Sequence, residues 1–238
     1  MIKSPADLLA ATASAWGLPL SSAQLAVFAS YAAELTNWNE RVNLTAIIGP
    51  DEIYLRHFLD SLSCALHWGD QPQSLVDIGS GAGFPGLPLK ILRPAIRLTL
   101  LESVAKKAVF LEHMVGLLGL EGVTVRAIRA EEAGRDPAQR GRYDVATARA
   151  VAELRVLAEY GLPLLRLGGR LLAPKGAAAR EEVQAAGPAL ATLGGELVGV
   201  HPVALPGFDD RQIVVIRKSA PTAERFPRPA GMPARRPL

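Results

Sequence analysis

The chain has 238 residues, of which 49% are hydrophobic and 21% charged, and its formal net charge is +3. These values are typical of a globular protein and exclude a largely disordered chain, and the length allows one large domain with an appendage or two small domains. The single cysteine, Cys64, excludes an internal disulfide, and no cysteine or histidine cluster has the spacing of a metal site. We therefore expect neither a disulfide scaffold nor a bound metal.

The first residues do not have the pattern of a secretion signal. Pro5 and Asp7 interrupt the apolar run that begins there, and no stretch of the sequence approaches 18 uninterrupted apolar residues. These features predict a soluble cytoplasmic protein that makes no contact with a membrane.

Residues 1–70 predict a helical N-terminal subdomain. Ser21 and Ser22 can cap a helix whose apolar side chains recur at helical spacing, and Asp51 opens a second helix of the same kind. The polar, asparagine-rich stretch between them, residues 36–50, is predicted to be a loop.

From residue 71 onward, β-like and helix-like segments alternate. The predicted strands cover residues 74–79, 97–102, 123–128, 143–148 and 169–174. The first predicted helix starts at Pro85, and three more cover residues 103–119, 151–166 and 178–193. A short glutamate-rich turn is predicted after the third strand. This alternation indicates a mostly parallel sheet covered on both faces. The last two predicted strands, 196–205 and 211–218, have no helix between them and predict an antiparallel hairpin. We therefore predict a Rossmann-like α/β fold with a doubly wound, seven-stranded sheet over residues 71–218.

Residues 219–238 form a basic, proline-rich tail. Residues 217–238 contain six basic residues and one acidic residue, whereas residues 1–70 contain three basic and seven acidic residues. Such a tail is suited to contact with a polyanion, but a frayed tail that keeps the protein soluble would have the same composition. The four prolines of residues 226–238 predict an extended chain and exclude a helix.

A glycine-rich loop follows the first predicted strand, where doubly wound sheets bind ligands. Gly81, Gly83 and Gly86 fit the G-x-G-x-x-G pattern of a dinucleotide site. Asp77, just before the loop, would repel a pyrophosphate but would attract the ammonium and sulfonium groups of S-adenosylmethionine. Together with Gly79 it favours a methyltransferase loop. An NAD-dependent oxidoreductase and a tight turn without a ligand are the alternatives.

Residues at the later strand ends support a nucleoside ligand. Glu102 ends the second strand, where a carboxylate can accept hydrogen bonds from both ribose hydroxyls of either kind of cofactor. Ala130 and Glu131 follow the third strand and can hold an adenine edge, although Glu131 could equally begin a solvated helix. Arg149 follows the fourth strand, where a charge needs an anion, a ligand, or a salt bridge to Glu131 or Glu153.

Several segments spread over most of the chain match one protein family. They are WNERVNLT (38–45), RHFLDSL (56–62), DIGSGAGFPG (77–86), LESVAKK (101–107), FL (110–111), YDVATARAV (143–151), KG (175–176) and the tail from residue 226. On these segments the chain resembles the bacterial GidB/RsmG family of S-adenosylmethionine-dependent 16S rRNA guanine-N7 methyltransferases. The resemblance implies a class I methyltransferase fold, and its implied target is guanine 527 in the 530 loop of 16S rRNA.

The loop pattern assigns Asp77 and Gly81 to the cofactor, and the resemblance implies the remaining contacts. The expected cofactor-binding residues are Asp77, Gly79, Gly81, Phe84, Glu102, Ser103, Val104, Ala130, Glu131 and Arg149. Phosphate contacts to RNA are expected from basic side chains near the site and in the tail. They are Lys106, Lys107, Lys175, Arg211, Arg225, Arg228, Arg235 and Arg236.

The implied chemistry needs no general base, because guanine N7 carries an exposed lone pair and can react through proximity and orientation. We assign no catalytic residue and expect Arg149 to position the cofactor or the RNA. The four histidines lie in separate segments without an acidic partner evident from spacing. The expected partner is 16S rRNA, in the 30S subunit or an assembly intermediate, bound by a monomer. A non-catalytic RNA-binding protein is a further alternative, suggested by the basic tail.

Overall fold

In the part of the chain that the structure describes, seven strands form one mixed sheet. The computed structural model describes residues 4–69, 72–208 and 210–238. The strands are β1 (Ser74–Ile78), β2 (Arg97–Leu101), β3 (Val123–Arg126), β4 (Tyr143–Thr147), β5 (Leu165–Lys175), β6 (Gly195–Pro202) and β7 (Gln212–Lys218). Their order is β3-β2-β1-β4-β5-β7-β6, with β1 to β5 parallel and β7 antiparallel to β5 and β6. The predicted doubly wound sheet and its C-terminal hairpin are confirmed.

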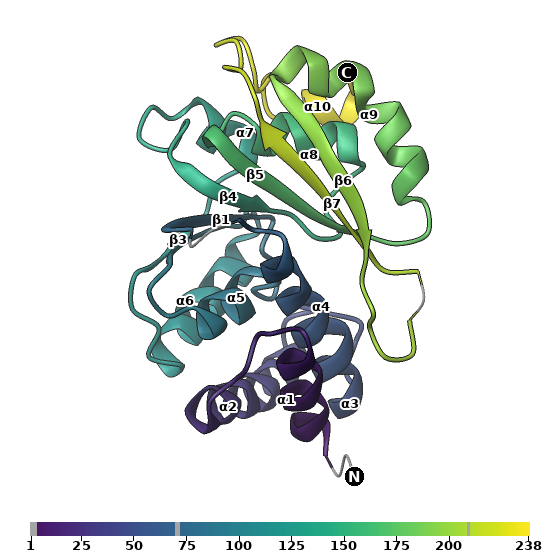
Figure 1. The fold of residues 1–238 in the computed structure, drawn as a ribbon. Coiled ribbons are helices and arrows are strands. Elements are labelled where there is room, and N and C mark those ends of the chain that lie inside the picture. Colours follow the sequence, from purple (N-terminus) through teal and green to yellow (C-terminus); the bar gives the residue numbers. More distant parts are fainter. Residues whose placement is uncertain (1–3, 70–71, 209) are drawn as a thin grey trace.

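Helices cover both faces of the sheet (Figure 1). They are α1 (Pro5–Ala15), α2 (Ser22–Asn39), α3 (Pro50–Glu52), η1 (Ile53–Leu59), α4 (Asp60–Leu62), η2 (Ser63–Leu66), α5 (Gly86–Leu92), α6 (Ala105–Leu117), α7 (Ala130–Arg135), α8 (Leu154–Gly161), α9 (Ala179–Leu193) and α10 (Met232–Arg235). The N-terminal helices, α5 and α6 lie on one face, and α7 to α10 lie on the other. Among the described residues, no helix has the length and apolar character needed to span a membrane.

β1 and β4 are neighbours in the sheet, but the helix after β1 covers one face and the helix after β4 covers the other. We call the place between these two strands the crossing point. Ligands of doubly wound sheets bind beyond the carboxyl ends of the strands at such a crossing point. The topology therefore predicts a ligand site at the loops that follow β1 and β4.

Helix α2 begins and ends close to the predicted limits. Ser21 caps it: its hydroxyl accepts the N–H of Gln24, while the Gln24 side chain accepts the N–H of Ser21. The helix continues to Asn39, so residues 36–39 of the predicted loop are helical.

The second N-terminal helical run begins at Pro50, one residue before the predicted Asp51. Proline is favoured in the first turn of a helix, where its missing N–H costs no hydrogen bond. The run continues through η1, a π-helical segment that contains Arg56 and His57. Such segments inside helices are frequent at functional sites.

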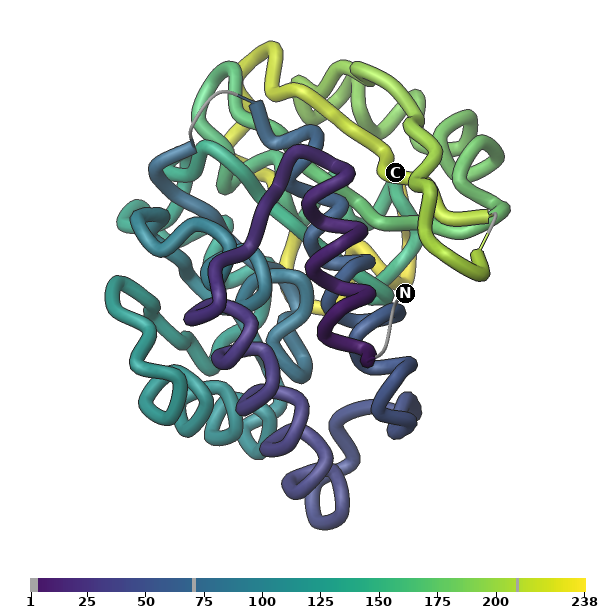
Figure 2. Tube along the Cα trace, turned by 60° about the horizontal axis from the view of Figure 1, so that its bottom comes forward, coloured from purple at the N-terminus to yellow at the C-terminus, as the bar shows by residue number. Residues whose placement is uncertain are grey.

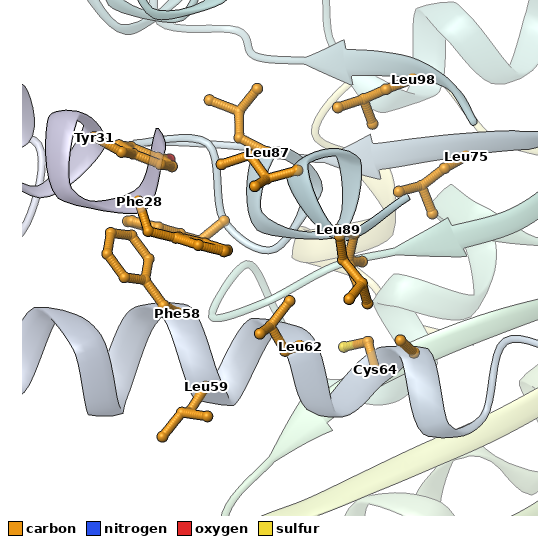
Figure 3. Packing of buried hydrophobic residues seen from close by; sticks show 14 of the residues in the cluster. Phe28, Tyr31, Phe58, Leu59, Leu62, Cys64, Leu75, Leu87, Leu89 and Leu98 are labelled. Carbon is orange, nitrogen blue, oxygen red and sulfur yellow. The ribbon is translucent and has the colours of Figure 1, made fainter. Parts of the chain in front are cut away.

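The N-terminal helices share one hydrophobic core with α5 and the sheet. Figure 3 shows Phe28, Tyr31 and Phe58 beside Leu87, with Leu75 of β1 in the same cluster. Figure 2 shows the N-terminal helices, in purple, running across the front of the molecule. The predicted boundary between residues 70 and 71 lies outside the described residues.

Two predicted boundaries in the middle of the chain are wrong. α8 spans Leu154–Gly161 rather than 151–166, because Pro163 has no N–H with which to continue the hydrogen bonding of the helix. β5 then starts at Leu165, four residues before the predicted strand. The glutamate-rich turn after β3 is the short helix α7.

The tail is folded onto the protein, so the frayed tail considered for this segment is wrong. Phe226 is buried in the core on the α8 side of the sheet. Its prolines do not exclude a helix, because α10 begins after Gly231 with Pro233 in its first turn, where proline is tolerated. The connection between β6 and β7 includes residue 209, outside the described residues.

Candidate active site

Two cavities open at the carboxyl edge of the sheet, next to the crossing point between β1 and β4. The larger, of about 600 Å³, is lined by residues 44–47, Arg56, His57, 79–82, Phe84, Lys107, 149–150, 174–176, Glu182 and Arg211. The smaller, of about 130 Å³, is lined by Ile78, Gly79, Leu101, Ser103, 128–131, Val151 and Tyr160. Gly79 contributes to both cavities, so the two adjoin at the glycine loop.

The glycine loop needs glycine at two positions because of its backbone and its neighbours. Gly79 has a φ of +65°, and a Cβ there would lie 2.7 Å from Cγ2 of Val151. Gly83 has a φ of +93°, and a Cβ there would lie 2.5 Å from the Tyr31 hydroxyl. L side chains rarely adopt such backbone angles, and both contacts are shorter than van der Waals distance.

Asp77 lies behind the loop, in contrast to the expected position facing a cofactor. Its carboxylate is completely buried, accepts the Gly86 N–H at 3.0 Å and the Thr147 hydroxyl at 3.1 Å, and lines neither cavity. Burial raises the pKa of Asp77 to about 7. In this structure Asp77 ties the loop to α5 and β4.

Glu102 joins the loop to the start of α6. One carboxylate oxygen accepts the Gly81 N–H at 2.8 Å and the other accepts the Val104 N–H at 2.7 Å. Each oxygen keeps a lone pair for another donor. The next residue, Ser103, lines the smaller cavity, whereas the Val104 side chain is exposed.

Ala130 and Glu131 lie in the wall of the smaller cavity at the start of α7. Glu131 is buried and accepts the N–H of Gly231 from the tail at 2.8 Å. The solvated helix start considered for this residue is therefore wrong for Glu131 and applies only to its exposed neighbour Glu132. Burial and the nearby Glu131 carboxylate raise the pKa of Tyr160 to about 12.

Arg149 does not pair with Glu131 or Glu153, the two partners considered for it. Its guanidinium donates to the Arg56 carbonyl at 2.9 Å and to the Asp60 carboxylate at 3.0 Å. Asp60, whose side chain is only 2% exposed, also lies 3.4 Å from Arg211. Sequence reasoning missed Asp60, although it lies in the matched segment RHFLDSL.

His57 is part of the same network. Its ring stacks on Phe84 with centroids 4.3 Å apart, and its Nδ1 lies 2.8 Å from an Arg149 nitrogen. Burial, with Arg149 as the next cause, lowers the pKa of His57 to about 3. The ring is therefore neutral near pH 7. Thr45, also missed from the sequence, lies 2.9 Å from the other ring nitrogen.

The basic residues predicted to contact RNA occupy three environments. Lys107, Lys175 and Arg211 line the larger cavity, and Lys175 is held there by Glu182 at 2.6 Å. Lys106 is exposed in the first turn of α6. In the tail, Arg225, Arg235 and Arg236 are exposed, whereas Arg228 binds the buried Glu159 through its backbone N–H and guanidinium. The Arg228 guanidinium is therefore committed to the protein rather than open to RNA.

The smaller cavity fits the adenosine part of S-adenosylmethionine by its chemistry. Ile128, Leu101 and Val151 give apolar walls for a base. Glu102 lies in the chain between two lining residues, Leu101 and Ser103, and each of its oxygens keeps a lone pair that can accept a ribose hydroxyl. The loop fits a pyrophosphate poorly, because Gly81 and Gly86 direct their N–H groups to the carboxylates of Glu102 and Asp77. This arrangement argues against the dinucleotide alternative.

Solved structures of methyltransferases share this fold. An O-methyltransferase from Bacillus cereus in complex with SAH matches with a TM-score of 0.59 at 16% identity, over 79% of this chain and 91% of that chain. A SAM-dependent methyltransferase from Aquifex aeolicus matches with a TM-score of 0.55 at 15% identity, over 79% and 98%. The fold is that of the class I S-adenosylmethionine-dependent methyltransferases.

Sequence comparison narrows this class to one family. A family profile described as GidB, rRNA small subunit methyltransferase G, matches residues 24–214. Proteins named ribosomal RNA small subunit methyltransferase G are 60% identical in Roseiflexus sp. (strain RS-1), over 98% of this chain and 99% of the relative, and 55% identical in Chloroflexus aggregans (strain MD-66 / DSM 9485), over 97% of both. The chain belongs to the rRNA small subunit methyltransferase G family, and the resemblance found in the sequence is confirmed.

Proposed function

We propose that the protein transfers a methyl group from S-adenosylmethionine to N7 of a guanine in 16S rRNA, guanine 527 of the 530 loop. The observation that carries this proposal is the pair of cavities that share Gly79. One has the chemistry of a nucleoside site, and the other is large, cationic and next to it. Family membership supports rRNA as the substrate.

In this proposal the smaller cavity holds the adenosyl group, with Glu102 on the ribose and Ala130 and Glu131 beside the adenine. When bound, S-adenosylmethionine supplies an electrophilic methyl group. The two cavities meet at Gly79, so ligands in the two cavities would lie next to each other.

The residues of the larger cavity orient a base and need not move a proton. Guanine N7 has an in-plane lone pair that is free at neutral pH, so orientation and exclusion of water are the main contributions of the protein. The neutral His57 ring and Phe84 form a stacked wall, and Asp60 balances the charge of Arg149. This balance suits a base that becomes positively charged on methylation.

Phosphate contacts fall to the basic residues around the larger cavity. Lys107 and Arg211 line it, and Nε of Arg56 is buried without a hydrogen-bond partner among the described residues. We assign residues 1–70 to shaping this cavity, 71–218 to the methyltransferase domain and 219–238 to the tail. One chain supplies both cavities, which favours a monomer, and an rRNA substrate favours a cytoplasmic enzyme.

The test is methyl transfer from radiolabelled S-adenosylmethionine to 30S subunits that lack the modification, to free 16S rRNA and to assembly intermediates. We expect incorporation at one guanine N7, mapped by cleavage at 7-methylguanine, and cofactor binding in calorimetric titration. Binding of NADH without S-adenosylmethionine would support the oxidoreductase alternative. RNA binding without cofactor binding would support the non-catalytic alternative.

A further inference from the structure

Thr45 lines the larger cavity, and its side-chain oxygen already has two neighbours within the protein. Oγ1 lies 2.9 Å from Nε2 of His57 and accepts the N–H of Ile47 at 3.1 Å. Asn39 fixes the backbone of the same residue, because its side chain accepts the Thr45 N–H and donates to the Thr45 carbonyl, both at 2.9 Å. The hydroxyl is therefore held at a defined place in the cavity wall.

Arg149 decides the direction of the hydrogen bond between His57 and Thr45. An Arg149 nitrogen lies 2.8 Å from His57 Nδ1, and a guanidinium carries only donors. Nδ1 must therefore accept, and the proton of the neutral ring is on Nε2, directed at Thr45. The other tautomer would set two N–H groups against each other. Asp60 and the Arg56 carbonyl keep Arg149 in this orientation.

The Thr45 hydroxyl is consequently a donor with no remaining capacity to accept. Its two lone pairs take the His57 and Ile47 N–H groups, and the hydroxyl hydrogen is left over. No residue within the described ranges accepts this hydrogen. An acceptor on a ligand in the larger cavity would complete the arrangement.

Resting on the proposed function, we infer that Thr45 identifies the target base as guanine by donating this hydrogen to O6, the atom next to the reacting N7. On this edge guanine offers two acceptors, N7 and O6, whereas adenine offers N7 and an amino donor. An ordinary hydroxyl could turn and accept from the adenine amino group. Thr45 cannot do so, because both of its lone pairs are used, and adenine would place donor against donor.

The test exchanges one functional group on each side of this contact. 30S subunits are reconstituted with 16S rRNA that carries guanine or 2-aminopurine at the target position; 2-aminopurine keeps N7, has hydrogen in place of O6 and lacks the N1 hydrogen, a difference that is the same for wild type and variants. For the wild-type protein, the loss of O6 should lower kcat/KM about ten- to hundredfold. In Thr45→Val this fall should shrink to about twofold, whereas in Thr45→Ser, which keeps the hydroxyl, it should stay within about threefold of wild type.

The outcomes separate recognition from a structural role. If Thr45 only supports the loop, Thr45→Val lowers kcat/KM equally for both substrates and leaves their ratio at the wild-type value, which overturns the inference. Where Thr45→Val fails to fold, two measurements on the wild-type protein decide. One is the ratio of kcat/KM between the guanine and 2-aminopurine substrates, and a ratio near one overturns the inference. The other is the set of ¹⁵N NMR shifts of His57, and a ring proton on Nδ1 overturns the inference as well. Absence of methyl transfer to the guanine-containing subunit refutes the proposed function itself, and this inference with it.

Discussion

The two cavities differ in how their walls are assembled from the chain. The smaller is lined by residues at the ends of β1 and β2 and in the segments that follow β1 to β4, together with Tyr160 of α8. The larger adds residues 44–47 and the π-helical η1 on one side and Arg211 on the other. Arg149 closes it through a hydrogen bond to Arg56, 93 positions earlier in the sequence.

The glycine loop thus contributes to two cavities whose walls form in different ways. The smaller cavity depends on the edge of a parallel sheet, where consecutive strand ends meet by topology. The larger depends on the packing of N-terminal helices against that edge. Substitutions in the two cavities should therefore change different measured quantities, namely cofactor affinity for the smaller and stability together with RNA methylation for the larger.

The largest effect is expected from Asp60→Ala, which changes the buried partner of Arg149, a residue that lines the larger cavity. This change leaves the guanidinium of Arg149 without its buried counter-charge, and we expect the free energy of unfolding to fall by about 3 kcal/mol. Urea denaturation measures it, with Glu112→Ala on the exposed side of α6 as the matched control, for which we expect a change of less than about 0.5 kcal/mol. Equal midpoints for the two variants would contradict the role given to Asp60.

Glu102→Gln should act on the smaller cavity instead. The amide group can no longer accept from both Gly81 and Val104, and a ribose hydroxyl would lose a charged acceptor. We expect affinity for S-adenosylmethionine to fall by about 2 kcal/mol, roughly thirtyfold, in calorimetric titration. Binding of rRNA should be unchanged, as should cofactor affinity in the control Glu112→Gln. A cofactor affinity equal to wild type would place the ribose elsewhere.

Two variants of the tail separate its role in stability from its role in RNA binding. Arg228→Ala removes the partner of the buried Glu159, and because the guanidinium is partly exposed we expect a loss of about 2 kcal/mol in unfolding free energy. The double variant Arg235→Ala/Arg236→Ala should keep wild-type stability. If these two arginines bind phosphates, it should flatten the log–log salt dependence of RNA binding by about 0.7 per contact. If instead Arg228→Ala flattened the salt dependence and the double variant lost stability, Arg228 would be the residue that faces the RNA.

The smallest effect is expected from the titration of Asp77, beneath the loop shared by both cavities. Its pKa of about 7 lies above the ordinary value of 3.8, so the folded protein binds a proton that the unfolded chain has already lost. Stability therefore falls as pH rises towards 7, by about 1 kcal/mol between pH 6 and 7. In Asp77→Asn this part of the pH dependence should vanish. An identical slope in variant and wild type would assign the titration to another group.

The sequence predicts the smaller cavity better than the larger one for a physical reason. Gly79, Glu102 and Ala130 each follow a strand, and the carboxyl ends of parallel strands meet at one edge whatever the details of packing. The segment lengths and the hydrophobic pattern were therefore enough to bring these residues together. The same reasoning places Arg149 at this edge.

The partners within the larger cavity were not predictable in the same way. The acidic residues considered for Arg149 were Glu131 and Glu153, which lie near it in the sequence or at a strand end, whereas its partner Asp60 comes from a helix 89 positions earlier. Which turn of that helix faces the sheet depends on packing and on the π-helical segment before it. The contact by which Arg228 docks the tail could not be predicted from the sequence either, because a proline-rich segment has no periodicity that marks a buried face.

The hydrogen bond from Gly231 to Glu131 joins the end of the chain to the wall of the smaller cavity, across 100 positions of sequence. A ribosome makes the chain from the N-terminus, and the segments that emerge first fold first. The sheet and the glycine loop can thus form before residues 219–238 are made, and the contact between Gly231 and Glu131 forms after them. The tail therefore docks onto a wall of the smaller cavity that is already folded.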